Sequence, residues 1–281
     1  MHSKRKKLIV SGCSFTTSKY KSAAYPDMKC DWHKWPELLA EKLDMDLVNL
    51  AFSGMGNRGI LLTLLEAIER TPKDEIGYVM AAWSQSNRDD YWIYKDFDYQ
   101  FTMEHFLKGF KWENTRKSRP GDVFSWVRET ILGYITLQNV CKRYNIPYKQ
   151  FQMLDLFSGW VSGLVRTEDE IQKILKGETD GDPYARDEYP GNDPAGDKKR
   201  LRELLLEYEK FIDSDNFIGW PTVRHLGGYS IEMKCTMKEL WHKNKFKGYE
   251  IIPDRVIGGV DKHPNENGHT KIMRHIYEQL G

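Results

Sequence analysis

Two short segments, one near each end of the 281-residue chain, contain residue types that can perform nucleophilic chemistry. In the first, Ser14 follows an apolar run and stands behind Gly12, so its hydroxyl can turn into a cleft. If a helical turn follows, the Ser14 backbone N–H points into the same cleft and can bind an oxyanion. Taken alone, this Gly-x-Ser tripeptide also fits an ordinary turn or a serine that caps a helix.

The second segment contains Asp261, His263 and His269. His263 can act as a general base if the Asp261 carboxylate holds its ring. The same three side chains can also bind a metal ion. We rank the metal site lower, because the spacing does not match the HExxH pattern of a helical zinc site. We therefore expect neither a metal nor an organic cofactor.

Two further loops carry groups that could stabilise an oxyanion. Gly54 lies in residues 49–57, where glycines let backbone amides approach a ligand closely. A flexible turn with Asn57 capping the next helix explains these residues too, and locally we favour that reading. Asn87 ends a polar run that begins at Ser84, and its amide could be another donor, although helix capping explains this run equally well.

A regular alternation of strands and helices is predicted to position these loops. Strands are predicted at residues 7–11, 46–50, 76–83, 147–154 and 215–219, and helices at 35–43, 59–70, 124–144, 201–212 and 266–280. The strand at 76–83 is apolar nearly throughout, as in parallel sheets covered by helices on both faces. We expect a three-layer, doubly wound α/β sandwich with a mainly parallel five-stranded sheet. Its reactive residues should follow the carboxyl ends of the strands.

The overall composition indicates one domain over residues 1–281, with insertions at about 88–124 and 156–250. The chain has 42 basic and 41 acidic side chains, so a nucleic-acid partner is not expected. Without an apolar stretch of 18 residues or a signal-peptide pattern, we expect cytoplasmic synthesis and no contact with a membrane. The scattered cysteines are read as reduced thiols; they are Cys13, Cys30, Cys141 and Cys235.

In their order along the chain, these segments resemble the sequence blocks of the SGNH/GDSL hydrolase superfamily. Residues 12–16, Gly-Cys-Ser-Phe-Thr, are similar to its Gly-Asp-Ser block, and Gly54 is similar to the glycine that contributes to the oxyanion hole. Residues 261–269 resemble its Asp-x-x-His block, with a spacing one residue shorter. Cys13 stands where the family usually has aspartate, which is a recurrent variant.

The third block of the family, Gly-x-Asn-Asp, has no counterpart in residues 83–87. Asn87 is our candidate for its asparagine, with Gln85 or Ser84 as substitutes. Loss of one oxyanion donor typically lowers the rate by about 10²–10³.

The resemblance implies the flavodoxin-like SGNH fold and a serine esterase, or an acyltransferase on the same machinery. Ser14 would be the nucleophile, His263 the base and Asp261 the residue that orients it. The hole would be formed by the Ser14 and Gly54 amides and the Asn87 side chain.

Aromatic residues around the insertions would suit stacking on sugar rings, so we favour a glycan ester as substrate, although ordinary packing explains any single one more readily. They are Tyr91, Trp92, Tyr94, Trp112, Trp126, Trp160, Trp220 and Trp241. The alternative is a catalytically weakened SGNH-fold binding or virion structural module. Chains with this Gly-Cys-Ser-Phe-Thr block and no signal peptide resemble bacteriophage-encoded proteins. The protein partners expected on this basis are other virion components or further copies of the same chain.

Overall fold

A computed structural model of the chain describes a central sheet, the helices that cover it and the loops at one of its edges. The described residues are 5–22, 25–86, 88–92, 110–113, 123–154, 156, 203–204, 207–218, 257, 261 and 263–280. None of the helices in these ranges is long and apolar enough to cross a membrane.

Five parallel strands form the sheet in the order β2-β1-β3-β6-β7. They are β1 (Lys7–Gly12), β2 (Asp46–Asn49), β3 (Ile76–Trp83), β6 (Tyr148–Gln152) and β7 (Phe217–Ile218). Numbered along the chain within this sheet, the order is 2-1-3-4-5, the arrangement of flavodoxin-like doubly wound folds. The predicted α/β class is confirmed, and every strand of the five is parallel.

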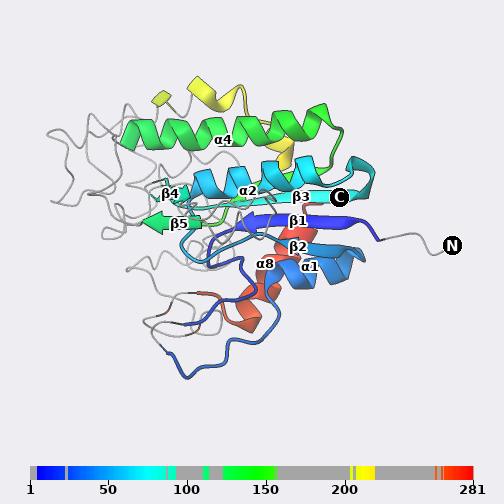
Figure 1. The fold of residues 1–281 in the computed structure, drawn as a ribbon, viewed down its shortest axis with the longest axis vertical. Helices are drawn as coiled ribbons and strands as arrows, with labels where there is room; N and C mark the ends of the chain where they lie inside the picture. Colours follow the sequence, from blue (N-terminus) through cyan, green and yellow to red (C-terminus); the bar gives the residue numbers. More distant parts are fainter. Residues whose placement is uncertain are drawn as a thin grey trace, which may run out of the picture.

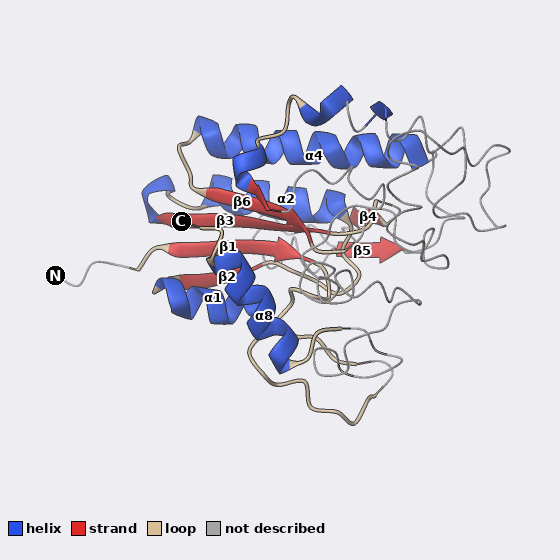
Figure 2. Cartoon of the chain, turned by 180° about the vertical axis from the view of Figure 1, so that it is seen from behind, coloured by secondary structure: helices blue, strands red, loops and turns tan. Residues whose placement is uncertain are grey.

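Helices cover both faces of the sheet, giving the expected three layers (Figures 1 and 2). On one face lie α2 (Asn57–Arg70) and α4 (Val123–Arg143), and on the other lie α1 (Trp35–Leu43) and α8 (Glu266–Tyr277). In β1, Ile9 packs into the core under α2 and α4, whereas Leu8 and Val10 pack into the core under α1 and α8. All three are fully buried, which explains why the strand lacks polar alternation.

The predicted elements agree with the structure in place and type. The helix at 35–43 and the strand at 76–83 have the predicted bounds, and the other main elements differ by a few residues at their ends. Short 3₁₀ turns precede two strands, η1 (Lys73–Glu75) before β3 and η2 (Ser214–Asn216) before β7. In the region predicted as a helix at 201–212, the described residues 203–204 and 207–209 are helical.

A small antiparallel sheet between β3 and α4 was not predicted. It pairs β4 (Asp89–Trp92) with β5 (Phe110–Glu113), both inside the insertion predicted at about 88–124. The fully buried Asp90 carboxylate accepts hydrogen bonds from the amides of Gly56 (2.8 Å) and Gly59 (2.7 Å) at the start of α2. Asp90 thus caps α2 from a distant strand.

The prediction that Asn57 caps the helix is wrong, because Asp90 occupies that role and Asn57 is already the first helical residue. Instead, the Asn57 side chain accepts from the Ser84 amide (2.6 Å) and donates to the Ser84 carbonyl (3.0 Å). Asn57 therefore holds the end of β3 against the start of α2.

Candidate active site

Ser14 lies in a single helical turn directly after β1, as the sequence suggested. The Cys13 carbonyl accepts hydrogen bonds from the amides of Thr16 (2.9 Å) and Thr17 (3.1 Å), which closes the turn. A Cβ atom on Gly12 would come within 2.5 Å of Thr16 Oγ1, so a side chain at this position would prevent so tight a turn. The strand end and the glycine together turn Ser14 out of the sheet at its carboxyl edge.

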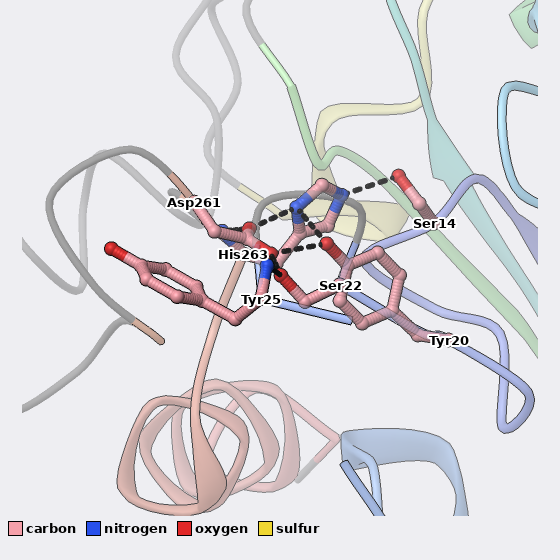
Figure 3. Close-up of polar contacts among 6 residues, drawn as sticks. All are labelled: Ser14, Tyr20, Ser22, Tyr25, Asp261 and His263. Atoms are coloured by element: carbon pink, nitrogen blue, oxygen red, sulfur yellow. Dashed lines mark hydrogen bonds and ion pairs between the residues drawn. The ribbon is translucent and has the colours of Figure 1, made fainter. Parts of the chain in front are cut away.

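Ser14, His263 and Asp261 form a continuous chain of hydrogen bonds (Figure 3). His263 Nε2 lies 2.8 Å from Ser14 Oγ, although the two residues are 249 positions apart. On the other side of the ring, His263 Nδ1 lies 2.7 Å from Asp261 Oδ1, which also accepts from the His263 backbone N–H (3.0 Å). Both contacts are within the range in which a nucleophile, a base and an orienting group can exchange a proton.

The base is placed by the start of α8. The side chain of Asn265 caps this helix by accepting from the Gly268 amide (2.9 Å). The helix packs against α1 through Ile272 and Ile276 in the core that also contains Leu39. His263 thus lies one short turn before a helix that is anchored beside the β1–α1 segment that carries Ser14.

Two residues that the sequence analysis missed also contact the Asp261 carboxylate. The Tyr20 hydroxyl donates to Asp261 Oδ2 (2.6 Å), and the Ser22 hydroxyl donates to the same oxygen. The Ser22 oxygen in turn accepts from the Tyr25 backbone N–H (3.1 Å). No pattern in residues 17–25 signals these contacts, because they join positions about as far apart as the chain allows.

The electrostatics of the site favour an ionised Asp261 and a neutral His263. Burial acts to raise the pKa of Asp261, but hydrogen bonds from Ser22, Tyr20 and His263 outweigh it and lower that pKa to about 2. Burial lowers the pKa of His263 and the positive charge of Arg88 adds to this, against the opposing effect of Asp261. At neutral pH the imidazole is therefore poised to accept the Ser14 proton.

Gly54 lies in a turn beside the end of β1. The Phe52 carbonyl accepts from the Met55 amide (3.1 Å), and Gly54 has a φ of 85°, as the third residue of a type II turn requires. The Phe52 amide donates to the Gly12 carbonyl (3.1 Å), which places the turn next to the strand end. Within the described part of the chain, neither the Ser14 nor the Gly54 amide donates to a protein acceptor.

The third predicted oxyanion donor, Asn87, lies outside the described residues. Of its two substitutes, Ser84 is buried, and its carbonyl accepts from Asn57 and from Gln152 Nε2 (2.5 Å). Gln85 Oε1 accepts from Arg88 Nε (3.3 Å). These contacts hold the end of β3 and assign neither Ser84 nor Gln85 to an oxyanion hole.

His269, which the metal alternative required, has a structural role. Its Nδ1 accepts from the Trp35 amide (3.2 Å) at the start of α1. Burial, with the charge of Lys34 as a smaller cause, lowers the pKa of His269 to about 3, so the ring is neutral and can accept this bond. Among the described residues, no three His, Cys, Asp or Glu side chains are grouped so as to hold a metal ion.

No protein-family model and no curated protein sequence matches the chain. Solved structures with a similar course include the psychrotrophic esterase EstA from a Pseudoalteromonas species, at 11% identity and TM-score 0.44 over 98% of this chain and 96% of that one. A lipolytic protein of the G-D-S-L family from Desulfitobacterium hafniense gives 10% identity and a TM-score of 0.43 over 98% of this chain and 99% of that one. The acetyl xylan esterase AlAXEase gives 11% identity and a TM-score of 0.40 over 97% of this chain and 98% of that one.

Proposed function

We propose that this protein is a serine esterase of the SGNH/GDSL type, with Ser14 as nucleophile, His263 as general base and Asp261 as its orienting carboxylate. The observation that carries the proposal is the pair of contacts on the two imidazole nitrogens, 2.8 Å to Ser14 Oγ and 2.7 Å to Asp261 Oδ1. A serine in such a chain can lose its proton as it attacks a carbonyl carbon.

The reaction proceeds through an acyl-enzyme. Ser14 Oγ bonds to the ester carbonyl carbon while its proton passes to His263 Nε2, and Asp261 stabilises the resulting imidazolium. The Ser14 and Gly54 amides bind the oxyanion of the tetrahedral intermediate. Its collapse breaks the bond to the alkoxide, which takes the proton from His263. Water then repeats the sequence at the acyl group and releases the carboxylic acid and free Ser14.

As substrate we propose an acyl ester of a carbohydrate, such as an O-acetylated glycan. Its support is the aromatic content of the chain, with nine tryptophans and fifteen tyrosines. Of the aromatic residues singled out above, Trp126 does not support it, because it is buried in the core with α2 and the sheet. Tyr91, Trp92 and Trp112 lie in β4 and β5, and Tyr94, Trp160, Trp220 and Trp241 lie outside the described residues. Comparing acetate release from acetylated saccharides with cleavage of long-chain esters tests this choice.

Replacing the nucleophile tests the esterase proposal. We expect the wild-type protein to hydrolyse a short-chain aryl ester and to be labelled by a fluorophosphonate, and Ser14→Ala to lose both while its thermal midpoint is kept. Ser18→Ala is a matched control, because Ser18 is an exposed serine of the same loop. A folded wild-type protein that neither turns over nor labels would contradict the proposal and favour the binding or virion structural module.

A further inference from the structure

The Asp261 carboxylate is held by four hydrogen bonds that divide between its two oxygens. Oδ1 accepts from the backbone and ring nitrogens of His263. Oδ2 accepts from the hydroxyls of Tyr20 and Ser22, which lie in the loop that begins at Ser14. A buried carboxylate that faces four donors has a fixed orientation, because rotation about its Cβ–Cγ bond would break all of them.

The Tyr20 hydroxyl also reinforces the imidazole tautomer that the contact of Nδ1 with the Asp261 carboxylate requires. It lies 2.9 Å from His263 Nδ1 as well as 2.6 Å from Asp261 Oδ2. Its proton goes to the charged carboxylate, since charge-assisted hydrogen bonds are the stronger and shorter ones. The Tyr20 oxygen then faces Nδ1 as an acceptor, so Nδ1 must carry a hydrogen and Nε2 is left free to accept the Ser14 proton.

The aromatic ring of Tyr20, like its hydroxyl, contacts the His263 imidazole and helps to hold it in place. The ring centroids of Tyr20 and His263 are 4.1 Å apart and the planes are inclined by 25°, a stacked arrangement. The Phe15 ring also contacts the imidazole, with centroids 4.5 Å apart. One loop therefore supplies the nucleophile, two aromatic contacts to the base and two donors to the carboxylate behind it. Figure 3 shows the nucleophile, the Tyr20 ring and the two donors.

We propose that Tyr20 and Ser22 are positioning residues, which fix the Asp261 carboxylate and the imidazole tautomer through which Ser14 is activated. This inference rests on the proposed esterase function. Neither side chain is the group that reacts with substrate. Each acts through Asp261, and Tyr20 acts through His263 as well. Burial first and the Asp261 contact second raise the pKa of Tyr20, so its hydroxyl keeps its proton over the working pH range.

Removing the hydroxyls one at a time tests this role. We expect Tyr20→Phe to lower kcat about 10- to 100-fold with little change in KM, since it removes a hydrogen bond to a charged group but keeps the ring. Ser22→Ala should have a similar effect, and Ser22→Thr should restore most of the loss. Tyr25→Phe is the matched control, because residue 25 contacts this network through its backbone N–H.

The pH profile separates a positioning role from a merely structural one. When one donor is removed, less of the negative charge of Asp261 is neutralised by hydrogen bonds. The carboxylate then stabilises the imidazolium more strongly, which raises the pKa of His263. The acid limb of kcat/KM should therefore move to higher pH in Tyr20→Phe and Ser22→Ala, and stay in place in Tyr25→Phe. The same shift should appear in an NMR titration of His263, which does not depend on turnover.

The outcomes distinguish this inference from the proposed function. If the wild-type protein is labelled by a fluorophosphonate and Ser14→Ala is not, the esterase function stands. The positioning role alone would then be overturned if two results were found together in the folded Tyr20→Phe and Ser22→Ala variants. These results are a kcat equal to that of the wild-type protein and a His263 titration that does not shift. If the wild-type protein neither labels nor turns over, the proposed function fails, and an unshifted titration in both variants would overturn the contact network too.

Discussion

Replacing Asp261 by asparagine separates the two contributions of this carboxylate, which are its negative charge and its orientation of the His263 ring. The His263 backbone N–H donates to Oδ1 and cannot turn around, so the asparagine must place its oxygen there. The new amide nitrogen then faces the Tyr20 and Ser22 hydroxyls, which can rotate to accept from it. The asparagine oxygen at the Oδ1 position still accepts from the His263 Nδ1–H, so the ring tautomer is kept and the charge is what is lost.

The size of the effect follows from Coulomb's law. The Asp261 side chain is 3% exposed and its Oδ1 lies 2.7 Å from His263 Nδ1. With charge centres about 4 Å apart and an effective dielectric constant of about 20, the imidazolium loses about 4 kcal/mol of stabilisation. That corresponds to a fall of about 10³-fold in kcat. In a serine protease whose asparagine variant adopts the wrong tautomer, the loss is about 10⁴-fold.

Steady-state hydrolysis of an aryl ester across a pH range measures this effect. Because Asp261 raises the pKa of His263, its neutralisation should move the acid limb of kcat/KM to lower pH, opposite to the shift expected for Tyr20→Phe. Asp261→Ala, which abandons orientation as well as charge, should be slower than the asparagine variant. A loss below about tenfold in a folded Asp261→Asn, or a shift to higher pH, would refute the assigned role.

Two further predictions concern stability. Asp90→Ala leaves two amides at the start of α2 without their acceptor and should lower the free energy of unfolding by about 1–3 kcal/mol in urea titration. Asp74→Ala, at an exposed position, should change it little, and equal effects would contradict the capping role. His269 has a folded pKa of about 3 against an ordinary 6.5, so the unfolded state binds more protons between these values and stability falls as pH drops from 6.5 toward 3. His269→Gln, whose side-chain oxygen can accept from Trp35, should reduce that slope, and an unchanged slope would show that another group causes it.

The fold could be predicted because its central strands β1 and β3 are buried on both faces and its helices on one. Residues 76–83 are almost wholly apolar and read as a central strand, whereas Leu61, Leu64, Leu65 and Ile68 repeat at helical spacing. The short sheet of β4 and β5 escaped prediction because Asp89–Trp92 and Phe110–Glu113 are four-residue strands of mixed polarity, without an apolar run such as the one at 76–83. The capping role of Asp90 could not be predicted for a related reason. In the sequence of a polar segment, an acidic residue that will be buried cannot be distinguished from one that stays in solvent.

The convergence of Ser14 with Asp261 and His263 could be predicted because each is marked locally and parallel-sheet topology brings strand ends together. Tyr20 and Ser22 lie in no local sequence motif that would indicate a role in the site. Their role arises only when the loop after β1 meets the segment before α8, and a pairing over 241 residues has no periodicity to reveal it.

The arrangement also explains how residues so far apart in the chain can be aligned to within a hydrogen bond. Two segments build the Ser14–His263–Asp261 chain of hydrogen bonds and its supporting contacts. The first runs from β1 through the loop to α1, and the second runs from Asp261 into α8. They are joined at both ends, at the site by the Asp261 contacts and behind it by the bond from Trp35 to His269 and the packing of α8 on α1. The position of the base relative to Ser14 is therefore set by direct contact between these segments. Substitutions that loosen the α1–α8 contact should reduce activity as well as stability, although they lie far from the substrate.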